Sequence, residues 1–199
     1  MIAIIDYGMG NVASVQTAFE NLGYQVVLTD DHATLRKASH IILPGVGSFQ
    51  AAMDEIEARD LKQILIELAE TKPFLGICLG MQLLFTEGTE GGLTKGLDLI
   101  PGSVDRIDTT HLLPHIGWNQ LQVTDLVPSF KAFNNEFVYF VHTFAANTMA
   151  KYIVATANYG VEVTAIVRKG NVFGIQFHPE KSATIGGEIL KTFLEEVKK

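Results

Sequence analysis

The most informative stretch of this chain is Pro73-Phe74-Leu75-Gly76-Ile77-Cys78-Leu79-Gly80-Met81-Gln82, which predicts a buried strand that turns directly into a helix. The apolar run at Phe74–Ile77 is typical of a short strand that is covered on both faces. Gly76 and Gly80 flank the chain's only cysteine, Cys78. In a sharp strand-to-helix turn the central residue adopts a strained backbone, and small neighbours leave room for it. The pattern therefore places Cys78 where a nucleophile elbow would hold it.

A base for this thiol is found near the end of the chain, in the sequence His178-Pro179-Glu180. A lone cysteine is more often a small buried hydrophobic residue than a nucleophile. Because a free thiol with a pKa of roughly 8.5 is mostly protonated at neutral pH, catalysis requires a base. Pro179 favours extended backbone at His178, and residues two apart in an extended chain project to the same side. We predict that Glu180 orients His178; the alternative is a surface turn.

Two backbone segments could stabilise an oxyanion. The residue after an elbow nucleophile normally contributes one N–H group, here that of Leu79. A second N–H could come from the loop Pro44-Gly45-Val46-Gly47, because glycines let the backbone approach a ligand closely. The alternative for this loop is an ordinary turn between a strand and a helix.

The first hundred residues alternate between strand and helix patterns. Predicted strands are Ile2–Ile5, Tyr24–Leu28, His40–Leu43 and Phe74–Ile77; predicted helices are Asn11–Leu22, Thr34–Ala38, Phe49–Ile56 and Leu61–Thr71. Alternation of this kind, with short apolar strands, favours a parallel sheet between two helical layers. We therefore predict an α/β fold, a flavodoxin-like three-layer sandwich with a mostly parallel central sheet.

The pattern changes after residue 86, where glycines between Gly88 and Gly96 mark a loop. The segments that follow predict an antiparallel C-terminal extension with a hairpin turn at Lys169-Gly170-Asn171. Its strands are Gln120–Val123, Phe137–Val141, Tyr152–Thr156, Val163–Arg168 and Val172–Phe177, and a helix follows at Glu188–Val197. Because no repeat or linker composition occurs, we expect residues 1–199 to form a single domain.

Composition excludes several classes of function. The chain is 47% hydrophobic and 19% charged, which is typical of globular enzymes, and its formal net charge of −7 argues against nucleic-acid or anionic-membrane binding. The run Ile2–Ile5 has no basic segment before it, and no stretch approaches the ~20 apolar residues of a membrane span. We expect a soluble cytoplasmic protein, since a single cysteine fits a reducing compartment.

The histidines other than His178 give no ligand pattern. His32, His40 and His111 have no partner spacing that suggests a metal, and no Cys/His ligand motif occurs. We expect neither a metal nor another cofactor.

Three motifs, in order over nearly the whole chain, resemble the triad-type (class I) glutamine amidotransferases: P-G-V-G, G-I-C-L-G-M-Q and Q-F-H-P-E. Other segments resemble one branch of that family, the glutaminase subunits of imidazole glycerol phosphate synthases. These segments are Asp6–Asn11, Gly80-Met81-Gln82, Pro114-His115-Ile116-Gly117-Trp118-Asn119 and Phe177–Ser182. Relatives that make anthranilate or carbamoyl phosphate usually have G-H-Q after the elbow. Because the chain ends soon after Glu180, we expect a free subunit rather than a fused form.

The resemblance implies a role for each matching residue. Cys78 would attack the side-chain amide of glutamine to give a thioester, His178 would transfer protons, and Glu180 would orient it. Val46 and Leu79 would supply the oxyanion N–H groups. The glutamine would be held by Gly47, Gln82, His142, Thr143 and Phe144. The family commonly has Tyr at the position of Phe144, so a contact through that hydroxyl is not expected here.

The resemblance also implies a partner, a (β/α)8 cyclase subunit that forms a heterodimer with this chain and receives the ammonia. The cyclase makes imidazole glycerol phosphate and an aminoimidazole carboxamide ribotide in histidine biosynthesis. Asn11 and Lys181 match interface positions, and Trp118 is a further candidate for the interface. Their alternatives are a helix N-cap for Asn11, a solvated lysine for Lys181 and plain core for Trp118.

Two other functions are weighed against this one. A glutaminase subunit of another pathway, or a γ-glutamyl hydrolase-like cysteine hydrolase, is disfavoured by P-H-x-G-W-N and G-M-Q. A non-catalytic flavodoxin-like binding module would not need Cys78, His178 and Glu180 together. We also expect low activity without the partner, because the glycines at Gly45 and Gly47 would allow an N–H group to be turned away from the site.

Overall fold

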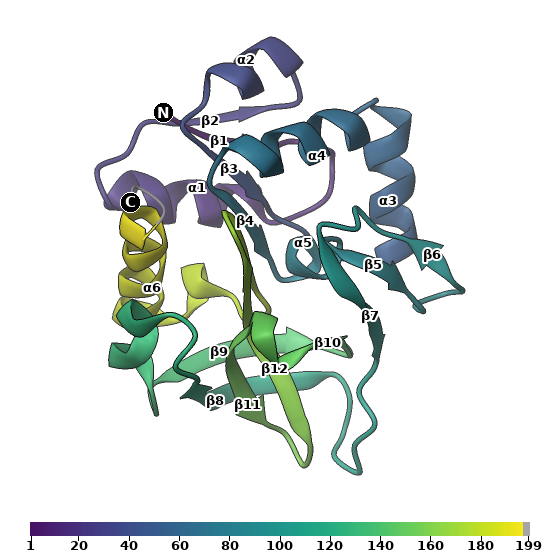
Figure 1. Cartoon of the computed structure of the whole chain (residues 1–199), viewed down its shortest axis with the longest axis vertical. Coiled ribbons are helices and arrows are strands. Elements are labelled where there is room, and N and C mark those ends of the chain that lie inside the picture. The colour runs from purple at the N-terminus through teal and green to yellow at the C-terminus, as the bar shows by residue number, and fades with distance from the viewer. Residues whose placement is uncertain (197–199) are drawn as a thin grey trace.

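The computed structural model describes residues 1–196 and contains a large and a small sheet (Figure 1). The strands are β1 Ile2–Ile5, β2 Val26–Thr29, β3 His40–Leu43, β4 Phe74–Ile77, β5 Phe85–Gly88, β6 Thr94–Lys95, β7 Ile100–Arg106, β8 His115–Val123, β9 Phe137–His142, β10 Phe144–Thr148, β11 Ile153–Asn158, β12 Glu162–Lys169 and β13 Val172–Ile175. The helices are α1 Val12–Asn21, α2 His32–Lys37, α3 Phe49–Ala58, α4 Lys62–Thr71, α5 Leu79–Gln82 and α6 Ala183–Glu196, with 3-10 turns η1 Pro128–Phe133, η2 Ala150–Tyr152 and η3 Pro179–Lys181.

The large sheet has nine strands in the order β2-β1-β3-β4-β13-β12-β11-β8-β9. Its first five strands are parallel, because β4 pairs in parallel with β3 and also with β13. From β13 onward the pairs are antiparallel, beginning with the β12–β13 hairpin. The predicted parallel sheet with an antiparallel extension is therefore confirmed. The strand late in the sequence, β13, lies beside β4 at the centre.

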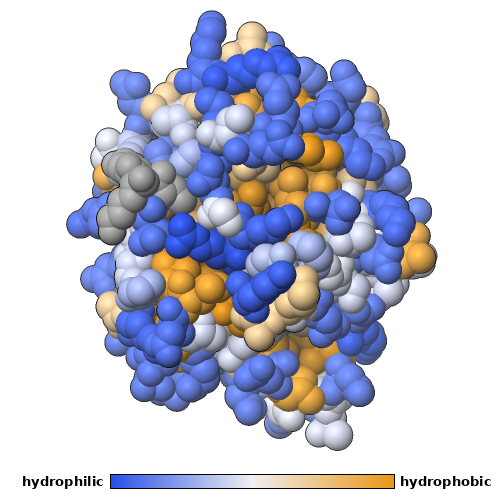
Figure 2. Space-filling model, viewed as in Figure 1, coloured by the Kyte–Doolittle hydropathy of each residue, from blue (hydrophilic) through white to orange (hydrophobic). Residues whose placement is uncertain are grey.

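Alternation along each strand decides which helical layer a side chain meets. In β1, Ile2 and Ile4 pack in one core with α1 and α6, whereas Ala3 and Ile5 pack in another core with α3 and α4. All four side chains are fully buried, as expected for strands covered on both faces. The three-layer α/β prediction is confirmed. The surface on the face shown in Figure 2 is mostly polar, with apolar side chains visible in separate patches.

A four-stranded sheet, β10-β7-β5-β6, was not predicted. It covers the core on the α3 and α4 side with apolar residues that include Phe85, Ile100 and Val104. β7 carries Pro101 and Gly102, residues that locally disfavour a strand, and it forms because β10 and β5 pair with it. Tertiary pairing, rather than local propensity, makes this sheet.

Several boundaries also differ from prediction. β8 begins at His115 rather than at Gln120, and α6 begins at Ala183 rather than at Glu188. Gly186 and Gly187 disfavour a helix locally, so the sequence does not indicate the first turn of α6. In the structure Gly186 is buried against η3. The predicted end of this helix at Val197 lies outside the described residues. No helix within residues 1–196 has the length and apolar character that crossing a bilayer requires.

The contribution of α6 to the core can be measured. Phe193 is fully buried, with its ring centroid 5.4 Å from that of Phe173. We expect Phe193→Ala to lower the free energy of unfolding by about 3–5 kcal/mol, because the truncation removes apolar contacts and leaves a cavity. Urea unfolding followed by circular dichroism measures the loss. Lys191→Ala, on the exposed side of the same helix, should change stability by less than about 0.5 kcal/mol; an equal loss in both variants would contradict the assignment.

Candidate active site

Cys78 lies between β4 and α5 in a strained backbone conformation, with φ 56° and ψ −114°. Its N–H donates to the carbonyl of Ile175 over 2.7 Å, which fixes the turn to β13. A Cβ on Gly80 would collide with the Leu43 carbonyl, and one on Gly76 would collide with the backbone of Gly80. Both glycines are required by close backbone approach. The predicted elbow is therefore present, and the turn leaves Cys78 at the wall of a cavity.

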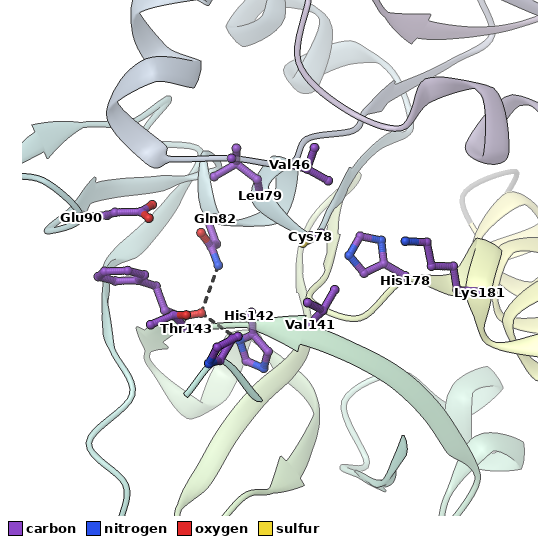
Figure 3. Close-up of a pocket in the computed structure, with 13 residues that line it drawn as sticks. Val46, Cys78, Leu79, Gln82, Glu90, Val141, His142, Thr143, His178 and Lys181 are labelled. Carbon is purple, nitrogen blue, oxygen red and sulfur yellow. Dashed lines mark hydrogen bonds between the residues drawn. The ribbon is translucent and has the colours of Figure 1, made fainter. Parts of the chain in front are cut away.

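His178 and Glu180 follow β13, the neighbour of β4, so they reach the same edge of the sheet as Cys78. His178 Nδ1 lies 2.7 Å from Glu180 Oε1, and their side chains are only 4% and 2% exposed. The alternative of a surface His-Pro-Glu turn is therefore wrong. His178 Nε2 is buried without a hydrogen-bond partner among the described residues. In Figure 3 the His178 ring lies next to the position of Cys78.

The electrostatics of this pair favour a cationic imidazole. Burial lowers the pKa of His178, but Cys78 and the hydrogen-bonded Glu180 raise it more, to about 9. At neutral pH His178 is thus protonated, and its Nδ1–H donates to Glu180. A cationic neighbour favours the thiolate form of a cysteine, which is the nucleophilic form.

The backbone around His178 is tied to β9. The His178 N–H donates to the Tyr139 carbonyl over 2.9 Å, and the Ser182 hydroxyl donates to the His178 carbonyl over 2.7 Å. Ser182 Oγ in turn accepts from the Tyr139 N–H over 3.0 Å. The buried Ser182 hydroxyl therefore holds the histidine segment against the strand that leads to His142.

A cavity of about 310 Å³ opens beside Cys78 and brings together most of the predicted site residues. Its lining includes Cys78, His178, Val46, Gly47, Leu79, Gln82, His142, Thr143, Phe144 and Lys181. Glu180 lies behind His178 rather than in this lining. The volume is at the lower end of the range for small-molecule sites.

Sequence reasoning missed Glu90, Pro114 and Val141, which also line the cavity. Glu90 stands in the glycine-marked loop after β5, where no periodic pattern draws attention to it. Its Oε2 accepts from the Phe49 N–H at the start of α3 over 2.9 Å. In the view of Figure 3, Glu90 and Gln82 lie on one side of Cys78 and His178 on the other. Glu90 adds a carboxylate to the lining.

The orientation of the Gln82 amide is fixed by its partners. Gln82 Nε2 donates to the Phe144 carbonyl over 3.0 Å and to Gln176 Oε1 over 3.1 Å. Turning the amide over would set its oxygen against the Phe144 carbonyl, which can only accept. Gln82 Oε1 therefore faces away from Phe144 and Gln176 and is an acceptor for a ligand. Gln176 is fully buried, and sequence reasoning did not single it out as a site residue.

The two candidate oxyanion donors lie in the cavity wall but are not aimed together. The Leu79 N–H donates to the Gly45 carbonyl over 3.3 Å. That carbonyl and the Val46 N–H belong to one peptide unit, in which N–H and C=O point in opposite directions. The Val46 N–H is therefore directed away from Leu79. Tyr7 holds the start of this loop by donating its hydroxyl to the Pro44 carbonyl over 2.7 Å.

The three predicted interface residues have different surroundings. Asn11 takes the N-cap position of α1, but its side chain makes no capping hydrogen bond, so the predicted cap is wrong in that respect. Trp118 is 50% exposed, and the plain-core alternative is therefore wrong. Lys181 is exposed and its side chain lines the cavity.

A strained cysteine on an elbow, with a buried His–Glu pair beside it on a mostly parallel sheet, defines the class of triad amidotransferases. The family described as glutamine amidotransferase class-I matches residues 3–197, so the chain belongs to this family.

Within the family, the chain is similar to imidazole glycerol phosphate synthase subunit HisH from two organisms. The Listeria innocua serovar 6a protein is 48% identical over 198 residues, which cover 98% of this chain and 95% of the relative. The Staphylococcus epidermidis protein is 48% identical over 195 residues, which cover 98% and 97%. The predicted resemblance to this branch is confirmed.

Solved structures show the same fold at lower identity. A glutamine amidotransferase crystal structure has a TM-score of 0.78 at 18% identity, covering 100% of this chain and 99% of that one. The structure of PurLQS from Thermotoga maritima has a TM-score of 0.72 at 21% identity, covering 98% and 97%.

The His178–Glu180 pair gives stability a predictable pH dependence. The folded pKa of about 9 exceeds the unfolded value of about 6.5. The stabilisation that protonated His178 gains from Cys78 and Glu180 is thus full below about pH 6.5 and is lost as pH rises through about 9. Glu180→Gln removes one cause of the raised pKa and should flatten this loss in urea unfolding. Glu188→Gln, an exposed change on α6, should retain the wild-type slope; a wild-type slope in Glu180→Gln would contradict the assignment.

Proposed function

We propose that this chain hydrolyses glutamine to glutamate and ammonia, with Cys78 as nucleophile. With protonated His178 beside it, the Cys78 thiolate bonds through Sγ to the side-chain amide carbon, and the C–N bond breaks as His178 gives its proton to the departing nitrogen, which leaves as ammonia. Water then attacks the thioester and gives one proton to His178; the C–S bond breaks, glutamate leaves, and the thiolate and the protonated His178 are restored. Glu180 keeps the imidazole oriented and stabilises its cationic form. The observation that carries this proposal is the strained Cys78 beside the buried His178–Glu180 pair.

The far side of the cavity supports recognition of the amino-acid end of glutamine. The Glu90 carboxylate and the Gln82 Oε1 acceptor suit an α-ammonium group, which is both cationic and a donor. His142, Thr143 and Phe144 form the neighbouring wall, and Gly47 also lines the cavity. Held there, the substrate would extend its side-chain amide toward Cys78 and His178.

We propose that the two oxyanion donors, the N–H groups of Val46 and Leu79, do not both face the active site until a partner binds. Turning the Gly45–Val46 peptide over would release the Leu79 N–H from the Gly45 carbonyl and bring the Val46 N–H toward the same point. Gly47 has φ 109°, a conformation that favours glycine, so the loop is built from residues that can absorb such a change. Both donors would then face the tetrahedral intermediate.

The partner is proposed to be a (β/α)8 cyclase subunit that forms a heterodimer with this chain and uses the ammonia in histidine biosynthesis. The relatives are named as synthase subunits, which supports a complex. An apolar face of β8 and β9 offers a docking surface: Ile116 is 57% exposed, Trp118 50% and Phe137 51%. β9 contacts η3, which carries Lys181, and η3 in turn contacts α1, the helix that Asn11 precedes. We place the whole chain, as one domain, in the cytoplasm, where a catalytic thiol stays reduced.

Glutamate release tests the proposed chemistry. The wild type should be slow alone and faster by at least about 100-fold with the cyclase partner and its ribonucleotide ligand, because the oxyanion donors contribute on that scale. Cys78→Ala should abolish release in both conditions while still binding the partner.

Two outcomes would redirect the assignment. Release that ignores the partner would favour a different cysteine hydrolase. No release under any condition, with a folded protein, would favour a non-catalytic binding module.

Trp118 tests the docking surface. Trp118→Ala should weaken binding of the cyclase partner by about tenfold or more, as expected for a large aromatic residue at the centre of an interface. Calorimetric titration measures the dissociation constant. The matched control is Leu28→Ala, a partly exposed apolar residue of β2 at the opposite edge of the large sheet. Equal affinities for Trp118→Ala and wild type would place the partner elsewhere.

A further inference from the structure

A buried pair of histidines connects the proposed glutamine pocket to a loop on the other side of β8. His142 Nδ1 lies 2.9 Å from the Phe144 carbonyl, and His142 Nε2 lies 2.9 Å from His115 Nδ1. His115 Nε2 lies 2.7 Å from Asn119 Oδ1, and the Asn119 amide nitrogen donates to the Asn158 carbonyl over 2.8 Å. Both imidazoles are buried. The chain of groups therefore has a carbonyl oxygen at each end.

Two neutral histidines cannot supply enough hydrogens for this chain. It has four links, and each link needs one donor and one acceptor. A neutral imidazole has one N–H and one lone pair, and the Asn119 amide likewise offers one donor side and one acceptor side. The three bridging groups thus give three donors for four links, whichever tautomers or amide orientation are chosen. One further proton on the histidine pair satisfies every link.

The surroundings of His115 suit a cation. Its ring stacks between Tyr159, with centroids 3.9 Å apart, and Phe140, with centroids 4.9 Å apart. Aromatic faces attract a positive charge, most strongly where water is excluded. The formal net charge of −7 on the whole chain acts in the same direction.

Other groups oppose the proton. Burial lowers the pKa of His115 and that of His142, and the charges of His115 and His178 lower that of His142 further. The Asn119 oxygen and the Phe144 carbonyl offset this only in part, so the pKa of His115 stays below its ordinary value and that of His142 falls to about 4. The shortage of donors along the four links, and not the electrostatics of the two rings, is what favours the proton. On the loop side the titratable groups are Tyr159 and His111, whose rings are 5.1 Å apart. Among residues 1–196 the rings' hydrogen-bond partners include no carboxylate.

Losing the proton forces one link to break. The least costly break is at the exposed end, where Asn119 would turn its amide over and let go of Asn158. That link anchors the loop at residues 158–160, where the Tyr159 hydroxyl donates to the Leu112 carbonyl over 2.7 Å and the Tyr159 carbonyl accepts from Thr109 Oγ1 over 2.8 Å. The loop at residues 109–114 ends at Pro114, which lines the cavity.

We propose that the His115–His142 pair holds a single shared proton at neutral pH, and that this proton ties the 158–160 loop, and through it the 109–114 loop, to the wall of the active-site cavity. His115 and Asn119 are then positioning residues. The role assigned to the cavity rests on the proposed glutaminase function, whereas the proton itself does not.

Nuclear magnetic resonance of protein labelled with ¹⁵N in its six histidines counts the proton directly. In the wild type at about pH 7, three of the pair's four ring nitrogens should carry hydrogen. In Asn119→Ala, which removes the outer links, only two should do so, because a neutral pair then satisfies the rest. Two protonated nitrogens in the wild type, or three in Asn119→Ala, would overturn the proposal. Spectra of His115→Gln assign the signals.

Hydrogen exchange and kinetics then test whether the shared proton holds the 158–160 and 109–114 loops to the cavity wall. Asn119→Ala should speed amide exchange at residues 109–113 and 158–160, and with the cyclase partner it should raise KM for glutamine by roughly three- to tenfold with little change in kcat. His32→Gln, which removes a histidine outside this chain of groups, should match the wild type in both. Unchanged exchange in Asn119→Ala would contradict the proposed attachment of these loops. A protonated pair in a protein without glutaminase activity would sink the proposed function and leave the shared proton standing.

Discussion

The parallel pairing of β4 with both β3 and β13 is the constraint on which the site depends. Its register sets Leu43 opposite Gly76 and Ile175 opposite Ile77, so three chain segments leave the sheet at one edge. The close approach of Gly80 to the Leu43 carbonyl then fixes the elbow. Cys78, the Gly45 loop and His178 meet because three strands end together, although 100 residues separate the cysteine from the histidine.

Features written in short local patterns could be predicted from the sequence. The apolar runs of β1 and β4, and of β3 after His40, indicated these strands directly, since a strand covered on both faces is a nearly continuous apolar run. The elbow was predictable because only glycine fits beside such a turn. The contact between His178 and Glu180 was also predicted, but only His178 is extended as expected before a proline; Pro179–Lys181 form a 3-10 turn, so the extended-chain reason for the contact is wrong. The family that uses Cys78, His178 and Glu180 in this way was identified by resemblance, and not from the physical chemistry of these residues.

The features that escaped prediction depend on distant partners. β7 contains residues that disfavour a strand, and only pairing with β10 and β5 makes it one. Glu90 lines the cavity because the loop after β5 of the small sheet brings it there. No sequence pattern near residue 90 indicates this position. The link between His115 and His142 arises from the cross-strand register of β8 and β9, where these two residues are opposite partners. Sequence spacing cannot supply that register.

His178 and the Gly45–Val46 peptide differ in how many hydrogen bonds hold them in place. His178 is fixed by three hydrogen bonds, to Glu180, to Ser182 and, across to β9, to Tyr139. By contrast, one 3.3 Å hydrogen bond from Leu79 holds the Gly45 carbonyl in its place. Breaking a bond of this kind costs about 1 kcal/mol, whereas an interface of ordinary size gains several times more. Under the proposed function, a partner would therefore reorient the Gly45–Val46 peptide at a lower free-energy cost than it would displace Cys78, His178 or Glu180. This arrangement would suit a glutaminase whose ammonia is used only by a second protein, because the cysteine would be in place before the two oxyanion donors converge.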